Sequence, residues 1–269
     1  MDRTGHITIG IAGIECCIFG SLARARAPLV FVVHGAGGNI ESNIDRARDL
    51  AAHGCTAVTI EQRNHGRRLV DRRALLRWHG RSTRDFLAMT NIMYEIIVGT
   101  ASDISLLIGM LPARIGIAPS GIGVTGFSLG GHVTLMAAAM DTRIDCAVPF
   151  IGSGDYHTLM RLRTAQYGHD VKAFDRYYEK RLQPLVKRYD PIEHVSAFVD
   201  RPLAMINGGA DDVVQLPCNE NFHARVRPLY TDKAKLRLSV HENVKHEVTK
   251  KMWAEGRTFL LSRLSAERA

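Results

Sequence analysis

The stretch of sequence that decides the fold is Ile122-Gly123-Val124-Thr125-Gly126-Phe127-Ser128-Leu129-Gly130-Gly131. Residues 122–125 form a short apolar run typical of a buried strand, and residues 132–140 are rich in Ala, Leu and Met, which favours a helix. A serine between a strand and a helix, in the pattern G-x-S-x-G, is held in a tight turn with its hydroxyl exposed. The alternative is a glycine-rich helix start without chemistry. We predict that Ser128 is a nucleophile at the carboxyl edge of a sheet.

The segments around this turn predict a mostly parallel sheet flanked by helices. Residues 29–33 form a continuous apolar run, which is typical of a central parallel strand, and they lead into the glycine loop 34–38. A helical pattern over 44–53 and a strand over 55–60 complete a β-α-β unit. We expect further strands at 7–11 and 14–19, as an antiparallel edge hairpin, and at 145–150, 203–206 and 235–240, with helices at 91–111, closed by Pro112, and at 250–264.

Length and composition favour one domain. The chain has 269 residues, of which 46% are hydrophobic and 23% charged, and neither an internal repeat nor a low-complexity linker interrupts it. We therefore predict a single domain over residues 1–269. Within it, residues 156–199 have an amphipathic helical pattern, and we expect this segment to form a small helical cap above the carboxyl ends of the strands.

Composition also argues against several kinds of partner. The formal net charge is +8, and the arginines gather mainly between residues 63 and 84. Because no aromatic residues are interleaved with them, we expect no nucleic-acid binding. No secretory signal is visible and no apolar run approaches the length of a membrane span, so we expect no membrane insertion. Five cysteines without disulfide or metal-ligand spacing indicate reduced thiols and a cytoplasmic location.

No cofactor or metal site is expected. Residues Gly121 to Gly126 match G-x-G-x-x-G, but this run precedes and occupies a strand instead of opening a helix, which argues against a dinucleotide site. The chain contains no P-loop pattern, and its His, Cys, Asp and Glu residues lack the spacing of metal ligands.

A serine hydroxyl becomes a good nucleophile only when a base accepts its proton and an acid orients that base. Such residues follow strand ends in α/β sheets. Ser128 follows one predicted strand, Asp211 and Asp212 follow the strand 203–206, and His246 follows the strand 235–240. His241 lies at the strand end, too early for the base. The order Ser, Asp, His predicts a catalytic triad in which either aspartate is the acid.

Acyl transfer also requires two N–H donors for the developing oxyanion. One is the backbone N–H of Leu129, directly after the nucleophile. The other is expected from the loop 34–38, in which His34 is expected to brace the backbone through hydrogen bonds.

Five stretches together resemble the α/β-hydrolase superfamily, and within it the dienelactone-hydrolase-like and acetyl-esterase-like serine esterases. They are residues 34–38, 63–68, 126–131, 207–214 and 246–249.

The resemblance implies the α/β-hydrolase fold and selects among the candidates. The acid pattern H-G-x-x-D-x-x-V, aligned on Gly208, places the acid at Asp211, although Asn207 replaces the usual histidine. His246 is the implied base, although Lys245 replaces the usual glycine. Ala36 is the implied second oxyanion donor, with Gly37 as the alternative.

Several residues are candidates for substrate contact. Arg63 and Arg68 either form ion pairs that hold their loop, which we favour, or bind a carboxylate on the substrate. Gly37, Trp78 and Tyr156 are candidate pocket residues; for Trp78 and Tyr156 the alternative is packing. Asp155 is expected to be structural.

The sequence thus predicts a cytoplasmic serine hydrolase that cleaves small-molecule carboxylic esters through an acyl-enzyme. Alternatives with the same triad are a thioesterase, a lactone hydrolase or a peptidase. A further alternative is a homologue that binds a ligand without catalysis. The sequence makes no prediction of the oligomeric state.

Overall fold

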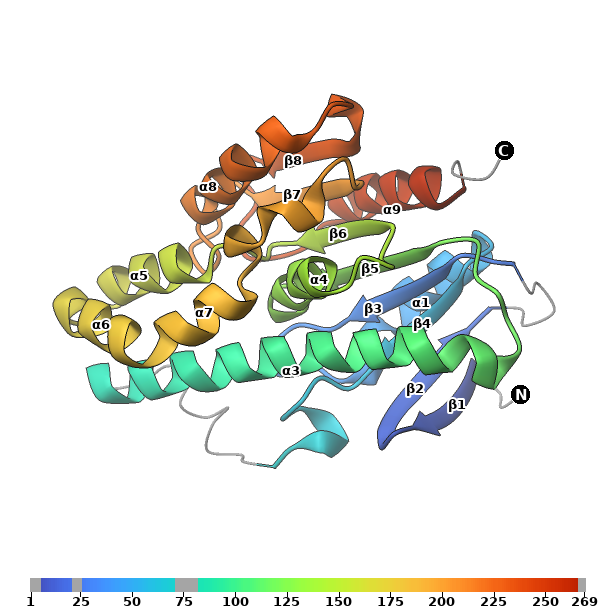
Figure 1. Cartoon of the computed structure of the whole chain (residues 1–269), viewed down its shortest axis with the longest axis horizontal. Helices are drawn as coiled ribbons and strands as arrows, with labels where there is room; N and C mark the ends of the chain where they lie inside the picture. Colours follow the sequence, from blue (N-terminus) through green and yellow to red (C-terminus); the bar gives the residue numbers. More distant parts are fainter. Residues whose placement is uncertain (1–5, 21–25, 71–81, 266–269) are drawn as a thin grey trace.

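The computed structural model describes residues 6–20, 26–70 and 82–265, and its centre is an eight-stranded sheet (Figure 1). The strand order is β1-β2-β4-β3-β5-β6-β7-β8. β1 pairs antiparallel with β2, β2 pairs antiparallel with β4, and all other neighbours are parallel. The strands are β1 (His6–Ile11), β2 (Ile14–Phe19), β3 (Leu29–Val33), β4 (Thr56–Ile60), β5 (Ile122–Phe127), β6 (Cys146–Phe150), β7 (Leu203–Gly208) and β8 (Leu236–His241). The predicted mostly parallel sheet is confirmed.

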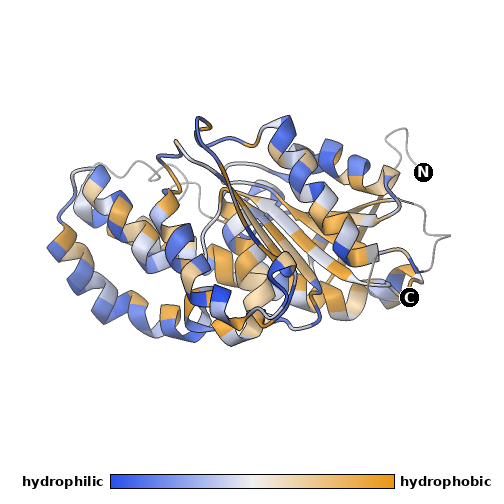
Figure 2. Ribbon diagram, turned by 90° about the horizontal axis from the view of Figure 1, so that it is seen from above, coloured by the Kyte–Doolittle hydropathy of each residue, from blue (hydrophilic) through white to orange (hydrophobic). Residues whose placement is uncertain are grey.

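Helices cover both faces of this sheet. β3 alternates between the two sides, with Phe31 and Val33 in one hydrophobic cluster and Val30 and Val32 in the other. The first cluster is completed by α3 (Thr83–Ile115), α4 (Leu129–Met140) and α8 (Leu216–Val226), and the second by α1 (Ile44–Ala52) and α9 (Lys250–Ser265). Figure 2 shows hydrophobic residues concentrated along the central strands, with hydrophilic residues on the helices around them.

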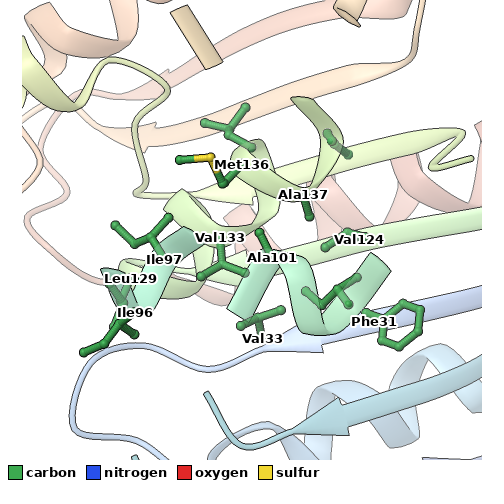
Figure 3. Packing of buried hydrophobic residues seen from close by; sticks show 14 of the residues in the cluster. Phe31, Val33, Ile96, Ile97, Ala101, Val124, Leu129, Val133, Met136 and Ala137 are labelled. Carbon is green, nitrogen blue, oxygen red and sulfur yellow. The ribbon is translucent and has the colours of Figure 1, made fainter. Parts of the chain in front are cut away.

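α4 is buried around most of its circumference because it lies between the sheet and a second helix. A helix in that position must be apolar on all sides. Figure 3 shows Leu129 and Val133 of α4 beside Ile97 and Ala101 of α3, with Val33 of β3 nearby. The helix that follows Ser128 is therefore fixed by packing on two sides.

α3 is longer than the sequence pattern predicted. It begins at Thr83, where the Ser82 hydroxyl caps it by accepting the N–H of Asp85. It also continues through Pro112, so the expected end at this proline is wrong. The helix ends instead at Gly116, which has a φ of 72° and donates its N–H to the Pro112 carbonyl. A proline in the last turn removes only one helical hydrogen bond, and the left-handed glycine supplies the actual stop.

α3 also corrects the expectation about apolar runs. Its most apolar 18-residue window has a mean hydropathy of 1.7. By length and composition alone, the helix is long and apolar enough to cross a membrane. Of that window, 56% is buried inside the protein, and α3 packs against α4. A core helix of this kind passes the same test as a membrane span, so the window alone does not indicate insertion.

The segment between β6 and β7 is helical, as the sequence predicted. It lies beyond the carboxyl ends of the strands, beside the N-terminal part of α3 (Figure 1). Its elements are α5 (Tyr156–Gln166), α6 (Val171–Tyr177), the π-helix η4 (Tyr178–Leu182), α7 (Gln183–Tyr189), and the 3₁₀ turns η5 (Pro191–Glu193) and η6 (Val195–Phe198). Other 3₁₀ turns are η1 (Ile40–Asn43), η2 (Gly66–Arg68), η7 (Arg227–Leu229) and η8 (Lys233–Lys235). That residues 156–199 act as a cap stays a prediction.

The close approach of α9 to the sheet is testable at Gly256. A Cβ atom there would overlap the ring of Phe150 and lie 2.9 Å from Ile206 Cδ1. Helix propensity alone favours Ala over Gly by about 1 kcal/mol, whereas overpacking a core costs about 1–3 kcal/mol. Gly256→Ala should therefore lower the free energy of unfolding by about 1–2 kcal/mol, measured by urea denaturation.

Gly109 in α3 provides the matched control. A Cβ atom at this position meets only Arg143 Nη1, at an ordinary contact distance of 3.4 Å. Gly109→Ala should raise the free energy of unfolding by about 0.5–1 kcal/mol. If both variants were stabilised, the described packing of α9 on the sheet would be incorrect.

Candidate active site

Ser128 occupies a strained turn between β5 and α4. Its backbone has a φ of 55° and a ψ of −115°, a conformation that is unfavourable for a residue with a side chain. A Cβ atom on Gly126 would overlap the backbone of Gly130, and one on Gly130 would overlap the carbonyl of Val33 and lie 2.5 Å from that of His34. The glycines on both sides of Ser128 are therefore required by close backbone packing, as the sequence pattern predicted.

The structure brings His246 and Asp211 to this serine. Ser128 Oγ lies 2.8 Å from His246 Nε2, and His246 Nδ1 lies 2.8 Å from Asp211 Oδ2. Because a carboxylate only accepts hydrogen bonds, Nδ1 carries the proton and Nε2 is free to accept the hydroxyl hydrogen. The backbone N–H groups of Val213 and Val214 donate to Asp211 Oδ1 over 2.8 and 2.9 Å, which fixes the buried carboxylate.

The two loops that carry Asp211 and His246 are packed against each other. The N–H of Gly209 donates to His241 O over 2.8 Å, and that of Ala210 donates to Val244 O over 3.0 Å. A Cβ atom on Gly208 would overlap the Val244 carbonyl, and one on Gly209 would lie 2.8 Å from the Glu242 backbone. These contacts set the distance between the loop after β7 and the loop after β8.

The alternative acid and the other nearby histidine lie elsewhere. Asp212 is exposed, whereas Asp211 is buried against His246. His241 Nε2 lies 3.0 Å from Glu255 Oε2 on α9, so its ring is committed to another partner. Of the candidates, only Asp211 and His246 are placed in line with Ser128.

The expected oxyanion loop, residues 34–38, lies against the serine turn. A Cβ atom on Gly35 would be 3.3 Å from Phe127 O and 3.6 Å from Ser128 Cβ. Leu129 is the first residue of α4, so its N–H has no acceptor within the helix. Ala36 is half-buried in the loop, and Gly37 has a φ of 72°, a conformation that favours glycine.

His34 braces this loop, as expected. Its Nδ1 donates to Gly35 O over 2.7 Å, and its Nε2 accepts the N–H of Gln62 over 3.2 Å. Burial lowers the pKa of His34 to about 4, so the ring is neutral around pH 7 and can act as donor and acceptor at once.

Arg63 and Arg68 form the ion pairs that we favoured. Arg63 Nε and Nη2 donate to the two carboxylate oxygens of Asp103 over 3.1 and 2.7 Å, and Arg68 Nη1 donates to Asp103 Oδ2 over 2.8 Å. Asp103 is 5% exposed, so the shared carboxylate holds the loop after β4 on α3. Substrate contact by Arg63 stays a prediction.

Tyr156 is a packing residue, which corrects the prediction that it contacts substrate. It is 3% exposed, its hydroxyl donates to Thr90 O over 2.6 Å, and its ring lies against Tyr94 with centroids 4.7 Å apart. The Tyr156 side chain therefore packs between α5 and α3, away from solvent. Trp78 lies outside the described residues. Asp155 caps α5 by accepting the N–H of Thr158, which is the structural role expected for it.

Sequence reasoning missed three buried polar residues near the site: Glu61, Gln62 and Asp103. Glu61 and Gln62 directly follow β4 at the carboxyl edge of the sheet, and this position after a strand end could have identified them as residues near the site. Asp103 stands alone on an apolar stretch of α3, where an isolated acid indicates a buried ion pair. In residues 6–20, 26–70 and 82–265, no group of three or more His, Cys, Asp or Glu side chains is placed to hold a metal ion.

Comparison with known proteins identifies the family to which the chain belongs. The model of the prolyl oligopeptidase family matches residues 84–258, well over half of the chain. The protein named "Putative esterase YitV" of Bacillus subtilis is 26% identical over 233 residues, covering 84% of this chain and 85% of its own length. Esterase YjfP of Escherichia coli is 24% identical over 173 residues, covering 64% of this chain and 68% of its own length.

The fold also matches a solved structure along nearly its whole length. The crystal structure of TT1662 from Thermus thermophilus superposes with a TM-score of 0.75 at 22% identity, covering 97% of this chain and 98% of that one. The similarity predicted from the sequence is confirmed. The chain belongs to the prolyl oligopeptidase family of the α/β-hydrolase superfamily.

Proposed function

We propose that this protein is a serine esterase that hydrolyses small-molecule carboxylic esters through a Ser128-His246-Asp211 triad. The observation that carries the proposal is the unbroken line of two 2.8 Å hydrogen bonds from the strained serine to the buried carboxylate. This is the arrangement in which a base activates a serine hydroxyl and an acid orients the base.

In the proposed reaction, Ser128 Oγ attacks the carbonyl carbon of the ester while its proton passes to His246 Nε2. The imidazolium then protonates the leaving alcohol as the C–O bond breaks, which leaves an acyl-enzyme. Water, deprotonated by His246, attacks the acyl carbon and releases the carboxylic acid and the free serine. Asp211 keeps Nδ1 protonated and stabilises the positive charge on the ring at each step.

The oxyanion of each tetrahedral intermediate would be bound by the N–H groups of Leu129 and Ala36, with Gly37 as the alternative to Ala36. Support for this assignment is the orphan N–H at the start of α4 and the contact between the loop 34–38 and the serine turn. Such preorganised donors are each worth about 10²–10³ in rate.

An ester substrate is favoured over an amide because both curated relatives are named esterases. The family takes its name from oligopeptidases, so a peptidase is the second candidate function. All five cysteines are buried and none forms a disulfide in the described residues, which supports a reducing, cytoplasmic location. We propose neither cofactor nor nucleic-acid partner.

Replacement of the nucleophile tests the proposal directly. Ser128→Ala removes the attacking oxygen and should lower kcat for p-nitrophenyl acetate by about 10⁶. A fluorophosphonate probe should label the unmodified protein at Ser128 and leave the variant unlabelled, as read by intact-protein mass spectrometry. A variant that kept most of its activity would contradict the mechanism. Labelling without ester turnover would favour the non-catalytic ligand-binding alternative.

The acid is tested with a matched pair of neighbouring residues. Asp211→Asn replaces the acceptor of the His246 Nδ1–H and allows the wrong imidazole tautomer, so kcat should fall by about 10⁴. Asp212→Asn alters an exposed side chain and should leave kcat within about twofold of the unmodified protein. The reverse pattern of kcat values would make Asp212 the acid.

The bond specificity is tested with one panel of substrates. We expect kcat/KM for p-nitrophenyl esters of short acids to exceed those for matched thioesters and anilides, because the relatives are named esterases. Higher kcat/KM for thioesters would reassign the protein as a thioesterase, and higher values for anilides would favour a peptidase.

A further inference from the structure

The loop 34–40 must hold the proposed oxyanion donor in a fixed position, although its glycine-rich sequence is flexible. Three of its residues, Gly35, Gly37 and Gly38, lack side chains, so the backbone has little stiffness of its own. A hydrogen-bond donor that stabilises a transition state must be held within about 0.5 Å of its productive position. Other parts of the molecule must therefore supply the rigidity.

The first attachment of this loop is made by Gln62. Its backbone N–H donates to His34 Nε2 over 3.2 Å, and its side-chain Nε2 donates to the His34 carbonyl oxygen. Gln62 is 0% exposed and His34 is 1% exposed, so water does not compete for these hydrogen bonds. Because His34 Nδ1 in turn donates to Gly35 O, the amide of Gln62 fixes the loop at its beginning.

The second attachment is made by the preceding residue. Glu61 Oε1 accepts the backbone N–H of Ile40 over 3.1 Å, at the other end of the same loop. Glu61 is 3% exposed, and Gly66 packs so closely on its carboxylate that any Cβ atom there would overlap it. The carboxylate is therefore confined to one position.

The next residue anchors this pair to the rest of the protein. The N–H of Arg63 donates to Thr100 Oγ1 over 3.1 Å, and its guanidinium binds Asp103 on the same helix. Three consecutive residues after β4 therefore connect the loop to α3, which is itself packed on α4.

We propose that Glu61 and Gln62 form a clamp on the two ends of the loop 34–40, and that Gln62 is a positioning residue for the oxyanion donor at Ala36. The inference rests on the proposed function and extends it to residues that touch neither the substrate nor the triad. The clamp acts on the step in which negative charge develops, so its loss slows turnover more than it weakens substrate binding.

Gln62→Met tests the clamp because it keeps the volume of the side chain and removes its donor to His34 O. We expect kcat for p-nitrophenyl acetate to fall roughly 10-fold to 100-fold with KM within about twofold, since a displaced donor costs less than a deleted one. The inhibition constant of a trifluoromethyl ketone, which forms an oxyanion adduct with Ser128, should rise by the same factor as kcat/KM falls.

Thr164→Val is the matched control. It removes a buried hydrogen bond, from Thr164 Oγ1 to Met160 O over 2.6 Å within α5, without touching the loop. Its unfolding midpoint in urea should fall as that of Gln62→Met does, while kcat and the inhibition constant stay within about twofold of the unmodified values. If kcat and the inhibition constant of Gln62→Met also stayed within about twofold of the unmodified values, the proposed clamp would be wrong.

Glu61 supplies a rescue test. Glu61→Gln keeps an oxygen that accepts the Ile40 N–H, and its kcat should stay within about fivefold of the unmodified protein. Glu61→Met removes the acceptor and should lower kcat at least 10-fold with KM nearly unchanged. Equal kcat values for these two variants would contradict the second attachment. If the unmodified protein hydrolysed none of the esters, the proposed function would be wrong. If the unmodified protein hydrolysed esters and the Gln62→Met and Glu61→Met variants did so equally well, only the clamp would be wrong.

Discussion

The site depends on one constraint, the contact of backbone with backbone where β5 turns into α4. A Cβ atom on Gly130 would overlap the carbonyl group of Val33, and one on Gly131 would lie 2.6 Å from Phe150 O and 3.0 Å from Gly152 Cα. Such contacts exclude every side chain, so the first turn of α4 is wedged between the ends of β3 and β6. This wedge overcomes the cost of the left-handed conformation at Ser128, which is unfavourable by about 1–3 kcal/mol.

The same constraint brings the remaining groups to the serine. Strands β3, β5 and β6 are neighbours in the sheet, so the glycine contacts that hold the turn also place the loop 34–38 beside it. The loops that carry Asp211 and His246 are held in the same way two strands away, where Gly208 and Gly209 lie against the backbone after β8. Because each functional group follows the end of a strand, pairing within the sheet determines the spacing of groups that are far apart in the sequence.

This dependence explains what the sequence could and could not predict. The sequence led to Ser128, Asp211 and His246 as the proposed triad because strand ends, glycines and chain order are all visible in it, and the structure places these three side chains in line. Tyr156 was assigned to the pocket from its place after a strand, but the direction of its side chain is set by packing against Tyr94 and Thr90, residues about 60 positions earlier. The end of α3 was misplaced for a similar reason, since a proline is visible in the sequence but its position relative to the capping glycine decides the outcome.

Two histidines besides the proposed base, His246, are kept neutral by burial. His34 and His132 are both buried, and burial lowers the pKa of each to about 4. His132 Nδ1 accepts the N–H of Ser153 over 2.8 Å, a bond that a protonated nitrogen could not accept. The His246 ring is partly exposed, with a side chain 22% accessible, and its carboxylate partner is Asp211, whereas His241 is paired with Glu255 on α9. In the proposed mechanism the serine proton passes to His246 Nε2 because that nitrogen lies 2.8 Å from Ser128 Oγ.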